Sequence, residues 1–397
     1  LRCFIRHDLD HIHLSSITGA VLSVTITLSM PSVVAEISHS DLGNPPICDA
    51  TITDLQHVAS YNWLDKTLPT ILVPGAPPLW SPPPRPPTMM PDSGTVYIDQ
   101  NAARSHYPLE PLLRALLVQN PKFELGDIDL VTDRNNIRKL LRFVQKSSSD
   151  PFEIQVEIAG SKTALFTRVE TKTKDTIQGF RGFGHNFEKA YTKGLVGSTG
   201  HHRIVHYHFG GLKFIIRHET DGYVDNKDGS SGIAEAPDVA DNLSDLLGAV
   251  SISETREPAR NMPVTVAKTK TAPVNLASTI EIKTRAASRT LDMIEVAPQL
   301  WISQTPILVV AYHRNRVFSD VRLRNVKQDI HDWEVANQTV LQKLAFLIKK
   351  ICTAVKSSGN RSGVVRYDGT KLKVTSGEQK RALPLDLYSL WDVKKQR

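Results

Sequence analysis

Residues 207–221, YHFGGLKFIIRHETD, decide how the fold of this chain is interpreted, together with residues 279–284, TIEIKT. Each stretch is typical of a β-strand with charged residues at alternate positions. Side chains at positions i and i+2 of a strand point to the same face, so Glu219 should project with Asp221. By the same rule, Glu281 should project with Lys283. Two adjacent strands of this kind predict a divalent-metal site beside a positive group, which suits attack on a phosphodiester or phosphoanhydride.

The composition is that of a globular protein with a mildly basic charge. The 397 residues are 40% hydrophobic and 22% charged, enough to bury one large core or two ordinary ones. The formal net charge of +7 favours a polyanionic partner. Three widely spaced cysteines indicate neither a disulfide framework nor a zinc knuckle, so a reducing compartment fits best. No run reaches the roughly 18 apolar residues of a membrane-spanning helix, so no membrane partner is expected.

The chain divides into three parts by composition. Residues 1–45 are expected to be an extension that is disordered or an artefact of the gene model, because acidic residues occur where a targeting leader would be cationic. Residues 46–94 are rich in proline and are expected to wrap the surface as an extended arm. Residues 95–397 are expected to form a nuclease-like catalytic domain. A flexible insertion at about 225–278 interrupts it, with one helical patch at 239–247.

The hydrophobic periodicity predicts an α+β fold with a mixed central β-sheet flanked by helices. Helical spacing recurs in four segments, and the strongest is the last: residues 108–117, 135–144, 292–303 and 327–357. Strand-like alternation or continuous apolarity marks residues 152–158, 162–171, 203–209 and 307–312. Residues 364–374 predict a hairpin around Asp368 and Gly369.

The order of the charged residues in 207–221 and 279–284 indicates what chemistry these stretches could perform. Glu219 and Asp221 follow the apolar run 212–216, which places them at the mouth of a sheet. An E-x-D followed by an E-x-K is similar to the metal site of nucleases in the PD-(D/E)XK class. In such a site the acids would hold Mg²⁺ or Mn²⁺, and the lysine would orient the attacking water or a phosphoryl oxygen.

Five elements in the right order make the resemblance more specific. The chain resembles a divergent fungal-type member of the decapping exoribonuclease (DXO) superfamily, which has a PD-(D/E)XK nuclease-like fold. The elements that carry the resemblance are Arg134 in VTDRNNIRKLL, Gly184-His185-Asn186-Phe187-Glu188, Glu219-Thr220-Asp221, Glu281-Ile282-Lys283, and Gln304 in PQLWISQTPILVVA. His185 stands where the family has an aromatic residue, and Thr220 stands at the middle of the third element.

The resemblance implies a metal-dependent hydrolase that acts on RNA 5′ ends, by decapping, pyrophosphohydrolysis or 5′–3′ exoribonuclease action. It implies an RNA 5′ end as partner, a possible exoribonuclease protein partner, and nuclear or cytoplasmic residence. The implied catalytic residues are Lys283, Glu281 and Gln304, and Arg134 joins Lys283 and Gln304 in binding substrate. The implied ligands of Mg²⁺ or Mn²⁺ are Glu188, Glu219, Asp221 and Glu281.

Two alternative interpretations remain open from the sequence. A non-catalytic relative would keep the fold and bind RNA or a nuclease partner; the presence of all the acids and the lysine argues against it. A geranylgeranyl pyrophosphate synthase, a name carried by some similar fungal sequences, is disfavoured because no DDxxD motif occurs in the chain.

Overall fold

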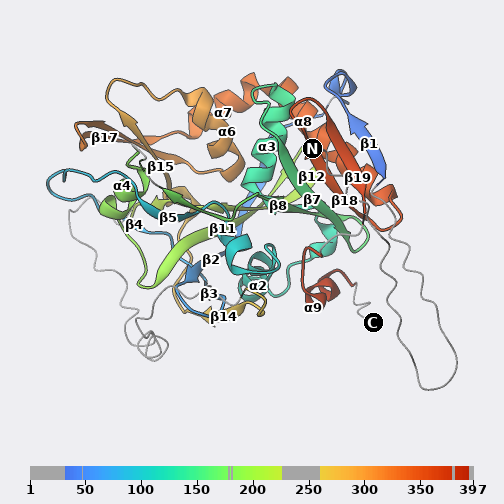
Figure 1. Cartoon of the computed structure of the whole chain (residues 1–397), viewed down its shortest axis with the longest axis horizontal. Coiled ribbons are helices and arrows are strands. Elements are labelled where there is room, and N and C mark those ends of the chain that lie inside the picture. The colour runs from blue at the N-terminus through green and yellow to red at the C-terminus, as the bar shows by residue number, and fades with distance from the viewer. Residues whose placement is uncertain are drawn as a thin grey trace, which may run out of the picture.

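The computed structural model describes residues 32–46, 48–177, 179, 182–225, 260–377 and 381–392. The expected helix at 239–247 and most of the N-terminal extension lie outside these residues. Within them, the chain is an α+β protein with two large mixed sheets, which confirms the predicted class (Figure 1). The helices are α1 (Gln100–Arg104), α2 (Glu110–Gln119), α3 (Arg134–Gln145), α4 (Gly184–Tyr191), α6 (Met293–Ser303), α7 (Lys327–Ala336), α8 (Gln338–Ser357) and α9 (Leu385–Tyr388).

The larger sheet has 11 strands and spans the middle of the molecule. Its order is β1 (Val33–Ile37), β19 (Leu372–Ser376), β18 (Ser362–Tyr367), β7 (Phe152–Ala159), β8 (Thr163–Val169), β6 (Leu130–Asp133), β12 (Leu212–Glu219), β11 (Ser198–Phe209), β2 (Thr53–Leu64), β3 (Thr70–Val73) and β14 (Thr265–Lys268). The hairpin expected at 364–374 is β18–β19.

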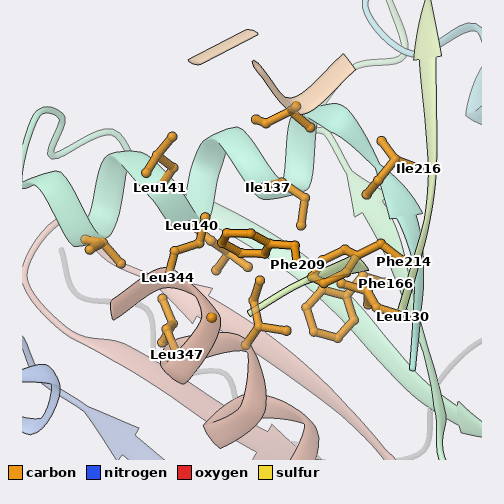
Figure 2. Close-up of a cluster of buried hydrophobic side chains, with 14 of the residues drawn as sticks. Leu130, Ile137, Leu140, Leu141, Phe166, Phe209, Phe214, Ile216, Leu344 and Leu347 are labelled. Carbon is orange, nitrogen blue, oxygen red and sulfur yellow. The ribbon is translucent and has the colours of Figure 1, made fainter. Parts of the chain in front are cut away.

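The central strands of this sheet are buried on both faces, which explains their continuous apolar sequence. Phe214 and Ile216 of β12 point into the core beneath α3 and α8, whereas Ile215 belongs to the opposite core with α2 and α9. Figure 1 shows these helix pairs on opposite sides of the sheet. In Figure 2, Leu140 of α3 and Leu344 of α8 lie in one cluster with Phe209 and Phe214.

The prediction that residues 207–221 form one strand was wrong, because they belong to two strands, β11 and β12. Gly210 and Gly211 have φ values of +57° and +76° and form a two-residue turn that pairs Phe209 with Leu212. Positive φ at both turn positions is the geometry that tight hairpins require and that glycine supplies. A Cβ atom on Gly210 would also lie 2.4 Å from Cβ of Ala345 on α8, so the turn can approach this helix only as glycine.

The second sheet has six strands and carries the TIEIKT stretch. Its order is β10 (Thr192–Lys193), β4 (Leu79–Trp80), β13 (Gly222–Tyr223), β15 (Thr279–Ala286), β16 (Ile307–Arg314) and β17 (Val317–Asn325). The prediction that the two acid-bearing strands are neighbours was therefore wrong, because β12 and β15 belong to different sheets. The chain changes sheets at Thr220 and Asp221, and the short β13 pairs with β15.

The expected wrapping arm over 46–94 contains a central strand. β2 pairs with β11 on one side and β3 on the other, and its second half is buried. The prediction failed because the prolines cluster after residue 73, while β2 itself contains none. The expected insertion at 225–278 is also partly regular, because β14 pairs in parallel with β3.

The helix expected over 327–357 is two helices, α7 and α8, which meet at Asn337. The other three predicted helices correspond to α2, α3 and α6. A separate two-stranded sheet joins β5 (Gly94–Tyr97) to β9 (Lys174–Ile177). Across the described ranges, no helix has both the length and the apolarity needed to cross a membrane.

Two buried histidines lie in the middle of β11. His201 is 4% exposed, and its Nδ1 donates to Oδ1 of Asn62 at 3.1 Å. His202 is 2% exposed, stacks on Tyr61 with 4.9 Å between ring centroids, and has Nε2 3.2 Å from Oε1 of Gln100. Burial lowers the pKa of both imidazoles well below their ordinary value, so both are neutral in the folded protein near neutral pH.

We expect these histidines to make the fold sensitive to acid. A histidine whose pKa is lower in the folded state stabilises fully above its unfolded pKa, and this stabilisation is lost as the pH falls below about 6.5. Two such groups should reduce the free energy of unfolding by about 3 kcal/mol between pH 6.5 and 5. Urea unfolding at several pH values should show a shallower dependence for His202→Gln. The control variant His331→Gln, at an exposed position, should retain the wild-type slope. An unchanged slope in His202→Gln would contradict this account.

Candidate active site

The acids of the two opening stretches meet where the chain passes from one sheet to the other. β12 ends at Glu219, and Asp221 follows two residues later, immediately before β13. Oδ2 of Asp221 accepts a hydrogen bond from the backbone N–H of Ile282 at 2.8 Å, which fixes Asp221 beside β15. The change of sheet therefore places Asp221 next to Glu281, although 60 residues of sequence separate them.

Arg134 reaches the same place from the larger sheet. β6 runs parallel to β12 with Asp133 opposite Arg217, and Arg134 is the first residue of α3. Arg217 is fully buried and donates from Nε and Nη2 to the two carboxylate oxygens of Asp133 at 2.7 and 2.9 Å. This pair fixes the start of α3, from which Nη1 of Arg134 donates to Oε2 of Glu281 at 3.2 Å.

Glu281 is the buried centre of the site. Only 2% of the residue is exposed, and Lys283 and Gln299 both donate to its Oε1 while Arg134 occupies Oε2. Burial alone would raise the pKa of this carboxyl, but the charges of Lys283 and Arg134 lower it below its ordinary value. Glu281 and Lys283 thus share one face of β15, as their spacing predicts.

Glu188 approaches from α4, whose N-terminus is held by Asp92. The carboxylate of Asp92 accepts from the backbone N–H groups of His185 and Asn186 at 3.2 and 2.9 Å. Phe187 packs into the core of the smaller sheet and sets the orientation of the helix. Desolvation and the negative charges of Asp221, Glu281 and Glu219 raise the pKa of Glu188 well above its ordinary value, so each of these three acids lies within electrostatic range of Glu188.

The carboxylates carry more negative charge than the neighbouring cations balance. Burial and repulsion from Glu281 raise the pKa of Asp221, and its own charge does the same to Glu188. Oxygen donors with uncompensated charge fit a hard divalent cation such as Mg²⁺ or Mn²⁺. Among the side chains that the structure describes, however, no three His, Cys, Asp or Glu residues stand in a metal-binding geometry. Both oxygens of Glu281 contact cationic or amide groups.

Gln304 does not reach this site, and the sequence-based assignment must be corrected. Gln304 ends α6 in the left-handed region, at φ +53°, and its Nε2 donates to the carbonyl of Trp301 at 2.6 Å. Its side chain lines a separate cavity with Ile52 and Glu334. Gln299, more than one helical turn earlier on the same helix, contacts Glu281 instead. Both glutamines belong to the stretch that carries the resemblance, so only the packing of α6 distinguishes them.

A small cavity beside Arg134, which we call the arginine cavity, was not predicted. Its volume is about 210 Å³, and its lining includes Arg134, Arg138, Arg168, Asp99, His218 and Glu219. Arg138 makes no hydrogen bond or ion pair within the described ranges, and burial together with Arg134 and Arg142 lowers its pKa to about 10. Oδ2 of Asp99 and Nε2 of His218 are buried and make no hydrogen bond within the described ranges, although Nε of Arg168 lies 3.9 Å from Oδ2 of Asp99. Because Arg138 lies four residues after Arg134 on α3, helical spacing could have identified it.

A second, wider cavity, which we call the outer cavity, opens on the other side of the carboxylates. Its volume is about 810 Å³, and Glu188, Arg285, Arg289 and Glu295 contribute to its lining. Arg285 and Glu295, which both line it, form an ion pair at 2.8 Å. The carboxylate cluster is therefore flanked by a small cavity near Glu219 and a large one near Glu188.

The chain matches the family described as "Domain of unknown function (DUF8563)" over residues 42–391. No curated protein matches it in sequence.

Several solved structures share the fold at low sequence identity. Rai1 of S. pombe is 14% identical with a TM-score of 0.52, over 87% of this chain and 99% of that one. Rai1 of Scheffersomyces stipitis, in complex with (3′-NADP)⁺ and calcium, is 12% identical with a TM-score of 0.56, over 90% and 99%. Rai1 of Candida albicans, in complex with pU5 and Mn²⁺, is 11% identical with a TM-score of 0.53, over 92% and 99%. These matches confirm, for the fold, the resemblance to decapping exoribonucleases.

The buried pair of Arg217 and Asp133 should be essential for stability. Removing one partner leaves an uncompensated buried charge, so Arg217→Met should lower the free energy of unfolding by about 3–5 kcal/mol. The double variant Arg217→Met/Asp133→Leu should recover part of that loss. Arg366→Gln, which breaks an exposed pair with Glu153, should cost about 1 kcal/mol or less. Denaturant unfolding measures all three, and an equal cost for the buried and the exposed pair would contradict this role.

Proposed function

This chain belongs to the DUF8563 family, and we propose that it is a metal-dependent hydrolase acting on RNA 5′ ends. The observation that carries the proposal is the buried Glu281, held by Arg134, Lys283 and Gln299, with Asp221 and Glu188 in electrostatic range. Perturbed carboxylates and cations gathered between two cavities are typical of a catalytic centre rather than of a structural ion pair.

In this proposal Glu188, Glu219, Asp221 and Glu281 hold Mg²⁺ or Mn²⁺, directly or through water. The bound ion would supply Lewis-acid chemistry and an activated water at neutral pH. All four donors are carboxylates, which are the ligands that these hard cations prefer. The raised pKa values of Glu188 and Asp221 support the assignment, because a site with surplus negative charge gains from a cation.

The cationic side chains would orient the substrate. The guanidinium of Arg134 lies between Glu281 and the arginine cavity, where its planar donors suit a phosphate group. Lys283 presents an ammonium group beside Glu281 and can contact a phosphoryl oxygen as a point charge. Gln299 holds the Glu281 carboxylate in place. Phosphoryl hydrolysis depends mainly on such positioning.

The proposal that the substrate is RNA rests on the net charge of the chain and on the ligands of proteins that share its fold. The net charge of +7 favours a polyanion. Rai1 of Candida albicans, which has this fold, binds pU5 and Mn²⁺, and Rai1 of Scheffersomyces stipitis binds (3′-NADP)⁺ and calcium. These ligands favour a substrate with a 5′ phosphate or a nucleotide cap.

The non-catalytic alternative keeps one specific observation in its favour. Both oxygens of Glu281 are engaged by side chains of the chain itself. A relative that only binds RNA, or an exoribonuclease partner, would keep these contacts when Mn²⁺ is added. The two interpretations are therefore separated by metal-dependent turnover.

The experiment incubates purified protein and Mn²⁺ with 5′-triphosphorylated and capped short RNA and measures product release. Wild type should release product, and Glu281→Gln and Asp221→Asn should each lower the rate by about 100-fold or more. Glu36→Gln, at an exposed carboxylate of β1 paired with Lys371, should leave the rate unchanged. If wild type is inert on every RNA end and binds no Mn²⁺ by calorimetry, the non-catalytic interpretation is correct.

A matched pair of glutamine variants tests the corrected assignment within the same assay. Gln299→Ala should slow turnover about 10-fold, because residues that orient ligand carboxylates typically contribute this much. Gln304→Ala should retain the wild-type rate. The reverse pattern would restore the assignment made from the sequence.

A further inference from the structure

A basic groove continues from the outer cavity across β16 and β17. Its volume is about 520 Å³, and its lining includes Arg289, Tyr312, Arg314, Asp320 and Arg322. Arg289 and Thr290 line both this groove and the outer cavity, which also reaches Glu188. A continuous surface therefore leads from the carboxylates to the groove, and β17 lies at the edge of the smaller sheet (Figure 1).

The residues that line the groove include three arginines and one acid. Arg289 and Arg314 are exposed and form no ion pair with any residue that the structure describes. Asp320 is the acid of the groove lining, and Arg322 already binds both of its oxygens, at 2.8 and 2.7 Å. Two free guanidinium groups facing one groove form a binding surface for a polyanion.

Arg322 is fixed as a flat platform within the groove. Its guanidinium forms the bidentate contact with Asp320 and lies 5.4 Å from the ring centroid of Tyr312. An arginine that is held flat in this way can stack a nucleobase on its exposed face. Unpaired bases offer such faces, whereas the bases of a duplex are already stacked, so the groove suits a single strand.

The sizes of the cavities indicate which one could hold the end of a nucleic-acid strand and which one its body. The arginine cavity, at about 210 Å³, is smaller than a typical ligand pocket of about 300 Å³ or more and has room for a terminal group only. The outer cavity and the groove, at about 810 and 520 Å³, have room for several nucleotides. Of these two cavities, only the outer one has room for the body of a polymer whose end lies at the carboxylates.

We infer that the groove binds the body of a single-stranded RNA, with phosphates at Arg289 and Arg314 and a base stacked on Arg322. The inference rests on the proposed function for the position of the 5′ end. An acidic protein segment is the competing occupant, but it would make no use of the flat Arg322 platform.

The test measures binding without divalent metal, so that no turnover is needed. The probes are 5′-monophosphorylated oligouridylates of 12 and 2 nucleotides with a 3′ fluorophore, titrated at several salt concentrations. For Arg289→Gln/Arg314→Gln, the Kd of the 12-mer should rise about tenfold or more. Its slope of log K against log salt should fall by about 1.4, as expected for two lost phosphate contacts on a single strand. The Kd of the 2-mer should stay within about twofold.

A double variant of equal charge serves as the control. Arg366→Gln/Lys356→Gln removes two exposed cations from β18 and α8 and should bind the 12-mer as wild type does. The inference is overturned if this control weakens binding equally, if the groove variant binds the 12-mer normally, or if both probes weaken alike. Equal affinity of the groove for poly-glutamate would also overturn it, in favour of an acidic protein partner.

The binding result and the proposed function can fail separately. If the 12-mer binds through Arg289 and Arg314 but Mn²⁺ supports no hydrolysis, the groove inference is correct and the proposed activity is wrong. If the 2-mer is hydrolysed while the groove variant binds the 12-mer normally, the activity stands and the groove inference falls.

Discussion

The burial of the Glu281 carboxylate is the constraint on which the site depends. A carboxylate taken out of water is costly unless charge and hydrogen bonds compensate it. Here the compensation comes from three elements: Arg134 at the start of α3, Lys283 on β15 and Gln299 on α6. Because α3 follows a strand of the larger sheet and β15 belongs to the smaller one, the same contacts tie the two sheets together.

Much of the site follows from local sequence rules. The i, i+2 rule places Glu281 and Lys283 on one face of β15, and the structure shows their contact. Arg134 and Asp221 come to the same place because each lies at or beside the end of an element where the sheets meet, and Glu188 joins them from within α4. Burial on both faces explains the apolar runs from which the central strands were predicted.

The incorrect predictions have physical causes that a local sequence pattern does not show. Gly210 and Gly211 turn one apparent strand into a hairpin, and the pairing of β13 with β15 moves Glu281 into a second sheet. A choice between Gln299 and Gln304 depends on how α6 packs, since both lie in one short stretch. The strand β2 was missed because the prolines that follow it dominated the composition of the whole segment.

The fold alone does not decide between an enzyme and a binding protein, because one fold can host different functions. What distinguishes this chain is a charge distribution with opposite signs in adjacent places: surplus carboxylates at the sheet junction, and free guanidinium groups in the arginine cavity and the basic groove. Under the proposed function, the carboxylates would hold the metal ion and the guanidinium groups would contact an anionic substrate.

The most direct test of the central claim is a crystal structure of the protein soaked in Mn²⁺, with anomalous scattering used to locate the ion. The account predicts an anomalous peak at about 2.0–2.6 Å from carboxylate oxygens of Glu281 and Asp221. It also predicts that Arg134 no longer contacts Oε2 of Glu281. A structure at saturating Mn²⁺ without a peak, in which Arg134, Lys283 and Gln299 still surround Glu281, would contradict the claim that this cluster is a metal site.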